Sequence, residues 1–491
     1  MTIRSVAMGP QAAPNPGAAG GALLPPSALR PTRHAPRAAA DSRPPSLGEM
    51  LAESHYHGYL YAYPHKTAYR ALAPPVPLGP VWAAEDRSRL ALYLHVPFCE
   101  MRCGFCNLFA RASDDEDAHS MYLNALRRQA AVVRAEIGPA RFTRVAIGGG
   151  TPTLLSVAAL ASLLDLVEGL FGAPLSEVPA SVETSPLTAT AEHVALLASR
   201  RVSRASIGVQ SFFEDETRAA LRPQEPAVVA RALDRLMSSS IPVRNIDLIY
   251  GLPGQTPERF LASVRRALDY RPEELYLYPL YVRPATGLGK KDPSYVDVRL
   301  EAYRAARDLL SSEGYEQVSM RNFRRAAARP LPPSDPRPSP PDHACQVDGM
   351  VGLGCGARSY TTGLHHAERW ASGPAAVRSI LDDYVARPDA DFAVARHGIT
   401  LSEAERRRRH LIQSLLLAEG MDLAAYEGRF GAPVTEHFPM LGELFEHGLC
   451  TINPARARLA LTAAGLEASD VIGPWLVSPQ VRALSAEHED L

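Results

Sequence analysis

The sequence is poor in cysteine and has no long hydrophobic run. Six cysteines in 491 residues are too few and too unevenly spaced for the disulfide framework of a small secreted protein. No apolar run reaches the roughly 18 residues that a membrane span needs. No apolar segment follows a basic start at the N-terminus, as a secretory signal requires. We therefore expect a cytoplasmic protein that has no membrane partner.

The sequence also lacks an excess of charge of either sign. Lys and Arg together number 52 and Asp and Glu together 53, so no net field attracts nucleic acid or an anionic lipid surface. The composition therefore predicts no nucleic-acid partner. The length allows one large domain with one or two smaller ones.

Composition divides the chain into four parts. Residues 1–45 are dominated by Ala, Pro, Gly and Arg and are predicted to be a disordered leader. Residues 46–89 are rich in aromatic side chains and are expected to pack on the main domain or to border its active site. Residues 90–400 form that main domain, interrupted by a proline-rich insertion at 329–341. Residues 401–491 are predicted to form a small helical domain with a wing-like hairpin, as in winged helices.

Within the main domain, apolar strand patterns alternate with helical ones. The predicted strands are Leu90–Val96, Arg144–Gly148, Ala180–Thr184, Arg204–Gln210, Val243–Tyr250 and Glu274–Val282. The predicted helices between them are Ala118–Glu136, Val157–Phe171, Ala191–Ser199, Pro226–Ser238 and Thr256–Leu268. Strands that are each followed by a helix indicate parallel βαβ units. We expect an α/β fold, either a closed or partial barrel or a doubly wound sheet.

Three of the six cysteines lie within eight residues, directly after the first strand. Cys99, Cys103 and Cys106 have the spacing C-x3-C-x2-C. Structural zinc sites take four ligands, and ordinary iron–sulfur clusters take four cysteines. Three thiolates leave one iron with an open coordination position, which is a catalytic arrangement. A Cys3His zinc site that uses His95 is the alternative.

Polar residues and glycines follow the other predicted strands. They are Gly148-Gly149-Gly150-Thr151-Pro152, Glu183, Gln210, Asp247 and Tyr281. In barrels, the carboxyl ends of the strands form the active site, so these residues predict a single cleft. Glycines let the backbone approach a ligand closely, and carboxylates accept hydrogen bonds from ribose hydroxyls. Arg222, in the loop after the fourth strand, suits a carboxylate.

Two further polar features are interpreted as solvated. The run Arg406–Arg409 lies on a predicted helix and is expected to form its exposed face. The pair His365-His366 is expected in a loop.

The order of the motifs resembles one enzyme family. The segments YLHVPFCEMRCGFC, IGGGTPTLL, VETSP, SIGVQSF, NIDLIYGLPGQT and VGLGCGARSY resemble those of oxygen-independent coproporphyrinogen III oxidases, which are radical S-adenosylmethionine (SAM) enzymes. The likeness runs from Leu90 to Tyr360. It implies a partial (β/α)6 TIM-like barrel and a 4Fe-4S cluster on the three cysteines. SAM bound at the open iron is then cleaved reductively, and the resulting 5′-deoxyadenosyl radical abstracts hydrogen from an organic substrate.

The resemblance also implies which residues contact SAM. The positions that match contacts to the cluster-bound SAM are Tyr93, Gly149, Glu183 and Tyr281. The positions that match contacts to a second SAM are Phe105, Gly150, Thr151, Gln210, Arg222 and Asp247. A flavodoxin- or ferredoxin-type protein is the implied electron donor.

The chain departs from the family at two places. Leu108 stands where the oxidase has a fourth cysteine, and the stretch HACQVDGMVGLG from His343 lacks the His-Asn-x-x-Tyr-Trp motif of the heme-chaperone branch. Three functions therefore stay open. They are oxidative decarboxylation of a tetrapyrrole such as coproporphyrinogen III, radical methyl transfer with a second SAM, and heme binding.

Overall fold

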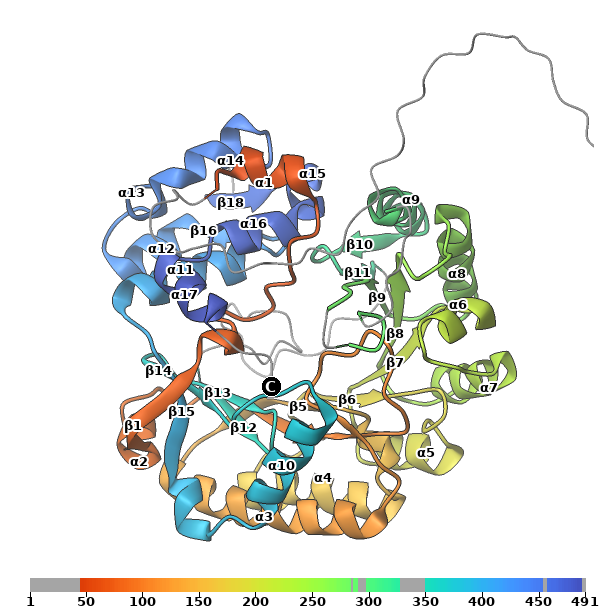
Figure 1. Ribbon diagram of the computed structural model, residues 1–491, viewed down its shortest axis with the longest axis vertical. Helices are drawn as coiled ribbons and strands as arrows, with labels where there is room; N and C mark the ends of the chain where they lie inside the picture. The colour runs from red at the N-terminus through yellow and green to blue at the C-terminus, as the bar shows by residue number, and fades with distance from the viewer. Residues whose placement is uncertain (1–44, 284–285, 290–296, 327–348, 454–456, 488–491) are drawn as a thin grey trace, which may run out of the picture.

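The computed structural model describes residues 45–283, 286–289, 297–326, 349–453 and 457–487 (Figure 1). The predicted leader, apart from residue 45, and the predicted insertion at 329–341 lie outside this part of the chain. Within it, the main domain is one 13-stranded sheet in the order β1-β15-β14-β13-β12-β2-β5-β6-β7-β8-β9-β11-β10.

The centre of the sheet is parallel and confirms the predicted α/β fold. Its strands are β12 (Met350–Leu353), β2 (Leu90–Val96), β5 (Phe142–Gly149), β6 (Ala180–Thr184), β7 (Arg204–Gln210), β8 (Val243–Tyr250) and β9 (Glu274–Pro279). Six parallel strands were predicted, and the described residues form seven. The seventh, β12, follows the proline-rich segment and pairs with β2.

Antiparallel strands extend the sheet at both edges. On the β12 side they are β13 (Arg358–Tyr360), β14 (Leu364–Ala367), β15 (Val394–Thr400) and β1 (Arg70–Pro77). On the β9 side they are β11 (Asn322–Arg325) and β10 (Tyr315–Gln317).

Helices cover the outer face of the sheet. They are α3 (Glu116–Ile137), α4 (Val157–Phe171), α5 (Ala191–Ser199), α7 (Pro226–Met237), α8 (Pro257–Asp269), α9 (Arg299–Ser312) and α10 (Pro374–Val385). Alternate strand residues, such as Leu92 and Leu94, pack with these helices in the main core. Because side chains alternate along a strand, the residues between them, such as Tyr93, point to the opposite, inner face.

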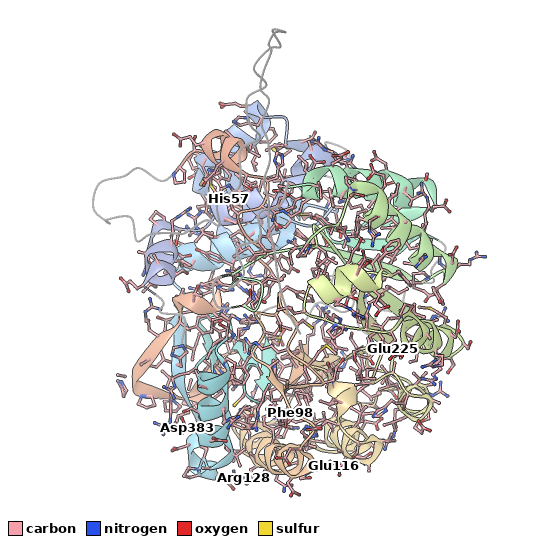
Figure 2. The ribbon with its side chains drawn as sticks, turned by 45° about the vertical axis from the view of Figure 1, so that its right-hand side comes forward. His57, Phe98, Glu116, Arg128, Glu225 and Asp383 are labelled. Carbon is pink, nitrogen blue, oxygen red and sulfur yellow. The ribbon has the colours of Figure 1, made fainter. Side chains whose placement is uncertain are left out.

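The N-terminal segment 46–89 is divided between two parts of the molecule. We predicted that it packs on the main domain, but α1 (Leu47–Glu53) lies among the C-terminal helices (Figure 1) and buries Leu47 in their core. His57, labelled in Figure 2, lies in the same upper part of the molecule. α2 (Leu78–Ala83) and β1 join the main domain. Between α1 and β1, Tyr61 packs on the inner face against the cluster that contains Tyr360.

The C-terminal helices have a hydrophobic core of their own. They are α11 (Glu403–Leu415), α12 (Leu423–Phe430), α13 (Val434–His437), α14 (Gly442–Glu446), α15 (Ala463–Glu467), α16 (Ser469–Trp475) and α17 (Pro479–Ala486). A small sheet accompanies them, formed by β16 (Met421–Asp422), β17 (Cys450–Asn453) and β18 (Arg458–Leu461).

Two predictions of solvation are wrong. Arg409 is 2% exposed, and its Nη1 donates to the carbonyl of Tyr63. His365 lies on β14 rather than in a loop and is fully buried. Among the described residues, no helix is long and apolar enough to cross a membrane.

Candidate functional site

The cysteine loop lies directly against the glycine-rich loop. The first loop follows β2 and carries Cys99 on the short strand β3 (Phe98–Cys99). The amide of Gly150 donates to the carbonyl of Val96 at 2.7 Å, and the amide of Thr151 donates to the carbonyl of Phe98 at 2.6 Å. The Thr151 hydroxyl lies 3.6 Å from the Cys99 sulfur. Two segments about 50 residues apart in the sequence thus form one site.

Contact between the two loops explains two of the glycines. A Cβ on Gly150 would lie 2.3 Å from the carbonyl oxygen of Phe98 and 3.0 Å from the Cys99 sulfur. Gly149 has φ +116°, and a Cβ there would lie 2.6 Å from the ring of His95. All three distances are shorter than van der Waals contact. A larger residue at position 150 would therefore push the two loops apart, and one at position 149 would collide with the His95 ring on β2.

Arg222 contacts the cysteine loop from the other side. Its Nη1 lies 3.1 Å from the Cys103 sulfur, and its Nη2 donates to the carbonyl of Gly208 at 2.8 Å. The side chain of Gln210 lies over Gly208, next to Arg222. Gln210 itself has φ +68°, and its Oε1 is buried without a partner among the described residues. Such a polar atom suits a ligand that donates a hydrogen bond.

Glu183 and Asp247 stand on the inner face of the sheet. Asp247 accepts hydrogen bonds from Ser206 Oγ at 3.0 Å and from Asn245 Nδ2 at 2.7 Å. Glu183 lies 3.8 Å from Arg204 Nη1, and its side chain is 43% exposed. Burial among neighbouring residues raises the pKa of both carboxyls, and the charge of Asp247 raises the pKa of Glu183 further.

The three predicted aromatic contacts occupy different places. The Tyr93 hydroxyl is 3.1 Å from His95 Nδ1 and lies close to Gly148. Phe105 packs in a small apolar cluster beside the cysteine loop. Tyr281 lies beyond β9, which ends at Pro279 rather than at the predicted residue 282. Its hydroxyl donates to Asp470 of α16 at 2.5 Å, so it faces the C-terminal helices.

The residues around the cysteines fit an iron–sulfur cluster with SAM. Hydrogen-bond donors from Thr151 and Arg222 face the sulfurs, as thiolates require. Burial raises the pKa of the Cys99 thiol to about 12, so a bound cation is needed to hold it as a thiolate near neutral pH. These contacts are consistent with the prediction that Cys99, Cys103 and Cys106 would hold such a cluster.

The described residues do not support the zinc alternative. Nowhere in the described chain do three or more His, Cys, Asp or Glu side chains converge as ligands of one ion. The two ring nitrogens of His95 contact the Tyr93 hydroxyl and, at 2.8 Å, the carbonyl of Phe109. A 4Fe-4S cluster differs in this respect, because each cysteine binds a different iron.

Three buried or half-buried arginines on the inner face were missed by the sequence reasoning. Arg204 pairs with Glu274 at 2.8 Å, and Arg321 pairs with Asp470. Arg358 donates to the hydroxyl of Tyr61 at 2.6 Å. The aromatic density of residues 46–89 was the available signal for this part of the site.

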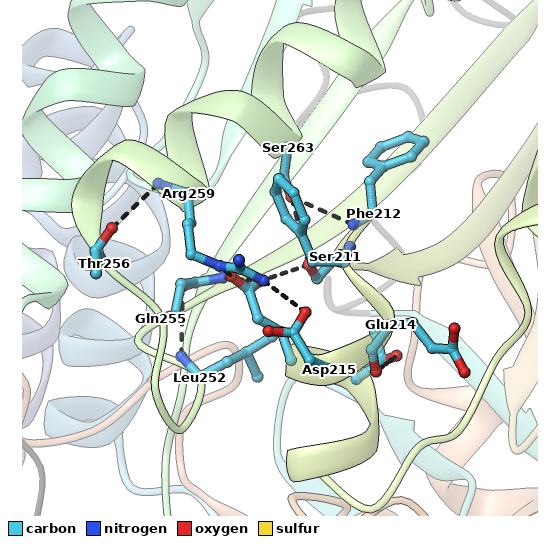
Figure 3. A network of polar contacts seen from close by, with 12 residues as sticks. Ser211, Phe212, Glu214, Asp215, Leu252, Gln255, Thr256, Arg259 and Ser263 are labelled. Atoms are coloured by element: carbon cyan, nitrogen blue, oxygen red, sulfur yellow. Dashed lines mark hydrogen bonds and ion pairs between the residues drawn. The ribbon is translucent and has the colours of Figure 1, made fainter.

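A buried carboxylate, Glu216, supports the loop that carries Arg222. Figure 3 labels three residues of the surrounding polar network, Ser211, Gln255 and Arg259. Glu216, on α6 (Glu214–Ala219), accepts hydrogen bonds from Ser211 Oγ at 2.6 Å, Gln255 Nε2 at 2.8 Å and Arg259 Nε at 2.7 Å. The same helix leads into Ala220, whose carbonyl accepts the amide of Gly104 in the cysteine loop at 3.0 Å. The network therefore connects the β7 and β8 loops to the cysteines.

Two regions of the chain, one of which contains this site, match known protein families. Residues 93–267, which include the cysteine and glycine loops, match the radical SAM superfamily. Residues 401–466 match the HemN C-terminal domain. Along the chain, the match to the radical SAM superfamily thus precedes the match to the HemN C-terminal domain.

The chain is also similar to individual proteins. The chain is 31% identical to oxygen-independent coproporphyrinogen III oxidase of Paracoccus denitrificans, over 53% of this chain and 59% of that protein. It is 29% identical to the heme chaperone HemW of Escherichia coli, over 56% of this chain and 70% of HemW. Its fold is similar to the solved structure of coproporphyrinogen III oxidase (HemN) from Escherichia coli, with a TM-score of 0.70 and 22% identity over 85% of this chain and 96% of that one.

Proposed function

We propose that this protein is a radical SAM enzyme that acts on an organic substrate in the manner of oxygen-independent coproporphyrinogen III oxidase. The observation that carries the proposal is the contact between the cysteine loop, the glycine loop and Arg222. When bound, a 4Fe-4S cluster supplies the electron that cleaves SAM reductively. The remaining chemistry of the site consists of binding, orientation and exclusion of water.

The residues around the cysteines divide these tasks. The glycine loop keeps side chains away from the sulfurs, because a Cβ at Gly150 would reach Cys99. Glu183 and Asp247 offer acceptors for hydroxyl or amino groups. Gln210 and Arg222 lie side by side and suit an amino-acid or adenine moiety, which supports SAM binding and leaves the number of bound SAM molecules to experiment.

The proposal is tested by anaerobic reconstitution of the full chain with iron and sulfide, followed by incubation with dithionite and SAM. We expect about four iron and four sulfide per chain and formation of 5′-deoxyadenosine. Each of the variants Cys99→Ser, Cys103→Ser and Cys106→Ser should lose both, whereas Cys450→Ser should keep both, because Cys450 lies in the C-terminal core. A wild-type protein that binds iron and forms no 5′-deoxyadenosine under any condition would refute the enzyme proposal.

The product assay separates the reactions that remain open. With methyl-labelled SAM, label in a new product indicates radical methyl transfer, whereas release of carbon dioxide from coproporphyrinogen III indicates oxidative decarboxylation. A flavodoxin or ferredoxin should replace dithionite as the electron donor.

Heme handling is the second candidate function, because HemW is among the relatives and 70% of its length is matched. A heme titration of the reconstituted protein measures it. A stoichiometric Soret shift without turnover of any organic substrate favours this function over the enzyme.

A further inference from the structure

Three arginines on the inner face of the sheet differ in how their charges are balanced. Arg204 has Glu274 at 2.8 Å and Glu183 at 3.8 Å. Arg321 forms a buried ion pair with Asp470. Arg358 forms no ion pair with any described residue, and its one side-chain hydrogen bond there goes to the Tyr61 hydroxyl.

The position of Arg358 on its strand determines the face of the sheet to which its side chain points. Arg358 and Tyr360 are two residues apart on β13 and therefore point to the same face. Tyr360 packs with Ala91 and Met350, on the face of β2 and β12 opposite to the helices. Arg358 is thus directed to the inner face, where the Tyr61 ring lies 4.8 Å from its guanidinium.

An uncompensated guanidinium at this position favours the binding of an anion. Arginine stays protonated at every physiological pH, so it cannot lose its charge to escape burial. Arg358 is only partly exposed, and tyrosine rings surround it. A buried charge without a partner is unfavourable, and a carboxylate matches the planar fork of the guanidinium.

Aromatic side chains continue from Arg358 toward the carboxylates of the site. The rings of Tyr59 and Tyr61 lie 5.4 Å apart, and Tyr61 and Tyr93 pack against the same cluster, which contains Tyr360. Tyr93 and Glu183 flank Gly148. Tyr59 is 41% exposed, so a ligand in this region meets aromatic surface and the cation together.

We propose that Arg358, with the Tyr61 hydroxyl, binds a carboxylate of an aromatic or other planar organic substrate on the inner face of the sheet. The inference rests on the proposed function, since it assigns this subsite to the substrate of the radical SAM reaction. The second source of a carboxylate in the site is SAM itself, and the test distinguishes the two.

The test measures binding by reconstituted full-length protein and does not need turnover. The probes are naphthalene-2-carboxylate and its uncharged counterpart naphthalene-2-carboxamide. Their binding is measured by thermal shift and by titration. Binding of SAM is measured separately by equilibrium dialysis. Three variants are compared with wild type: Arg358→Gln, Arg358→Lys and the control Arg458→Gln. Arg458 lies on β18 in the C-terminal part and pairs with Glu419, which is 69% exposed.

For the wild type and for Arg458→Gln we expect the carboxylate to bind more tightly than the carboxamide. Arg358→Gln should lose about 30-fold or more in carboxylate affinity, keep its affinity for the carboxamide and keep SAM binding. Arg358→Lys should retain part of the preference and serves as the readout if Arg358→Gln does not fold. Tyr61→Phe should lose only a few-fold, as for one hydrogen bond.

Three results would overturn the proposal. One is a wild type that does not discriminate between carboxylate and carboxamide, and another is an Arg358→Gln protein that discriminates as the wild type does. The third is loss of SAM binding in Arg358→Gln, which would assign Arg358 to the carboxylate of SAM. If the proposed function is wrong, the result differs: the protein still binds the probe and forms no 5′-deoxyadenosine.

Discussion

At the scale of single residues, Glu183 stands on the inner face beside a second carboxylate, Asp247. Burial and the neighbouring charge raise the pKa of Glu183 from its ordinary value of 4.5 to about 7. The folded protein therefore holds this proton more tightly than the unfolded chain does. Linkage requires that the free energy of unfolding falls as the pH rises through this interval.

The variant Glu183→Gln removes this charge and should stabilise the protein above the raised pKa. We expect no gain in the free energy of unfolding at about pH 4, where the carboxyl is protonated in the folded and the unfolded protein. The gain should then grow until about pH 7. Because 43% of the side chain is exposed, water screens the charge, and the gain should be only about 1 kcal/mol. Urea unfolding at several pH values measures it. Glu177→Gln, at an exposed position, should show no such trend, and an equal trend in both variants would contradict the assignment.

At the scale of elements, α6 holds the cysteine loop through its buried Glu216. Glu216 is 2% exposed and accepts hydrogen bonds from Ser211, Gln255 and Arg259. These donors lie in the loops after β7 and β8 and on α8. Breaking a buried ion pair by removing one partner leaves the other charge uncompensated.

The variant Glu216→Ala should therefore lower the free energy of unfolding by about 3 kcal/mol. It should also speed the loss of the brown cluster colour, because the segment from α6 to Arg222 contacts Gly104 and Cys103. The matched control is Asp215→Asn, which removes the other partner of Arg259. Asp215 is 73% exposed, so this change should cost less than about 1 kcal/mol. Equal effects of the two variants would show that the network does not support the site.

At the scale of the whole molecule, one buried ion pair joins the main domain to the C-terminal helices. Asp470 of α16 is 1% exposed and pairs with Arg321, which is 4% exposed. Tyr281 donates to the same carboxylate, and the Tyr59 ring lies 3.7 Å from the Arg321 guanidinium. The main domain, the N-terminal segment and the C-terminal helices thus share one charge cluster.

The variant Asp470→Asn should lower the free energy of unfolding by about 3–5 kcal/mol, because it leaves Arg321 buried without its anion. Denaturant unfolding monitored by circular dichroism measures the change. The control Glu487→Gln removes an ion pair with Arg70 whose carboxylate is 69% exposed, and should cost less than about 1 kcal/mol. If Asp470→Asn costs no more than this control, the pair does not join the two parts.

The elements could be predicted because their signals are local. The strands β2, β6, β7 and β8 begin and end where the apolar pattern predicted, since each strand buries an outer face against helices. β12 was not predicted as a parallel neighbour of β2. That pairing joins segments about 260 residues apart, a separation over which the sequence pattern holds no information.

For the candidate site, too, local signals could be predicted from the sequence and burial by distant elements could not. The cysteine spacing and the residues at the strand ends pointed to one edge of the sheet, because parallel strands place their carboxyl ends together. Arg409 and His365 were expected in solvent, and both are buried. Charge in the sequence predicts exposure only when no distant element covers the residue.

The sequence by itself determined the α/β order, the three thiols and the polar residues that end the strands, because periodicity and spacing are set by neighbouring residues. Only the tertiary structure decided which arginines are compensated. Arg358 meets Tyr61 across 297 residues and Tyr281 meets Asp470 across 189. The reason is physical: a buried charge is balanced by whatever the fold brings within a few ångströms, and that partner need not be near in the chain.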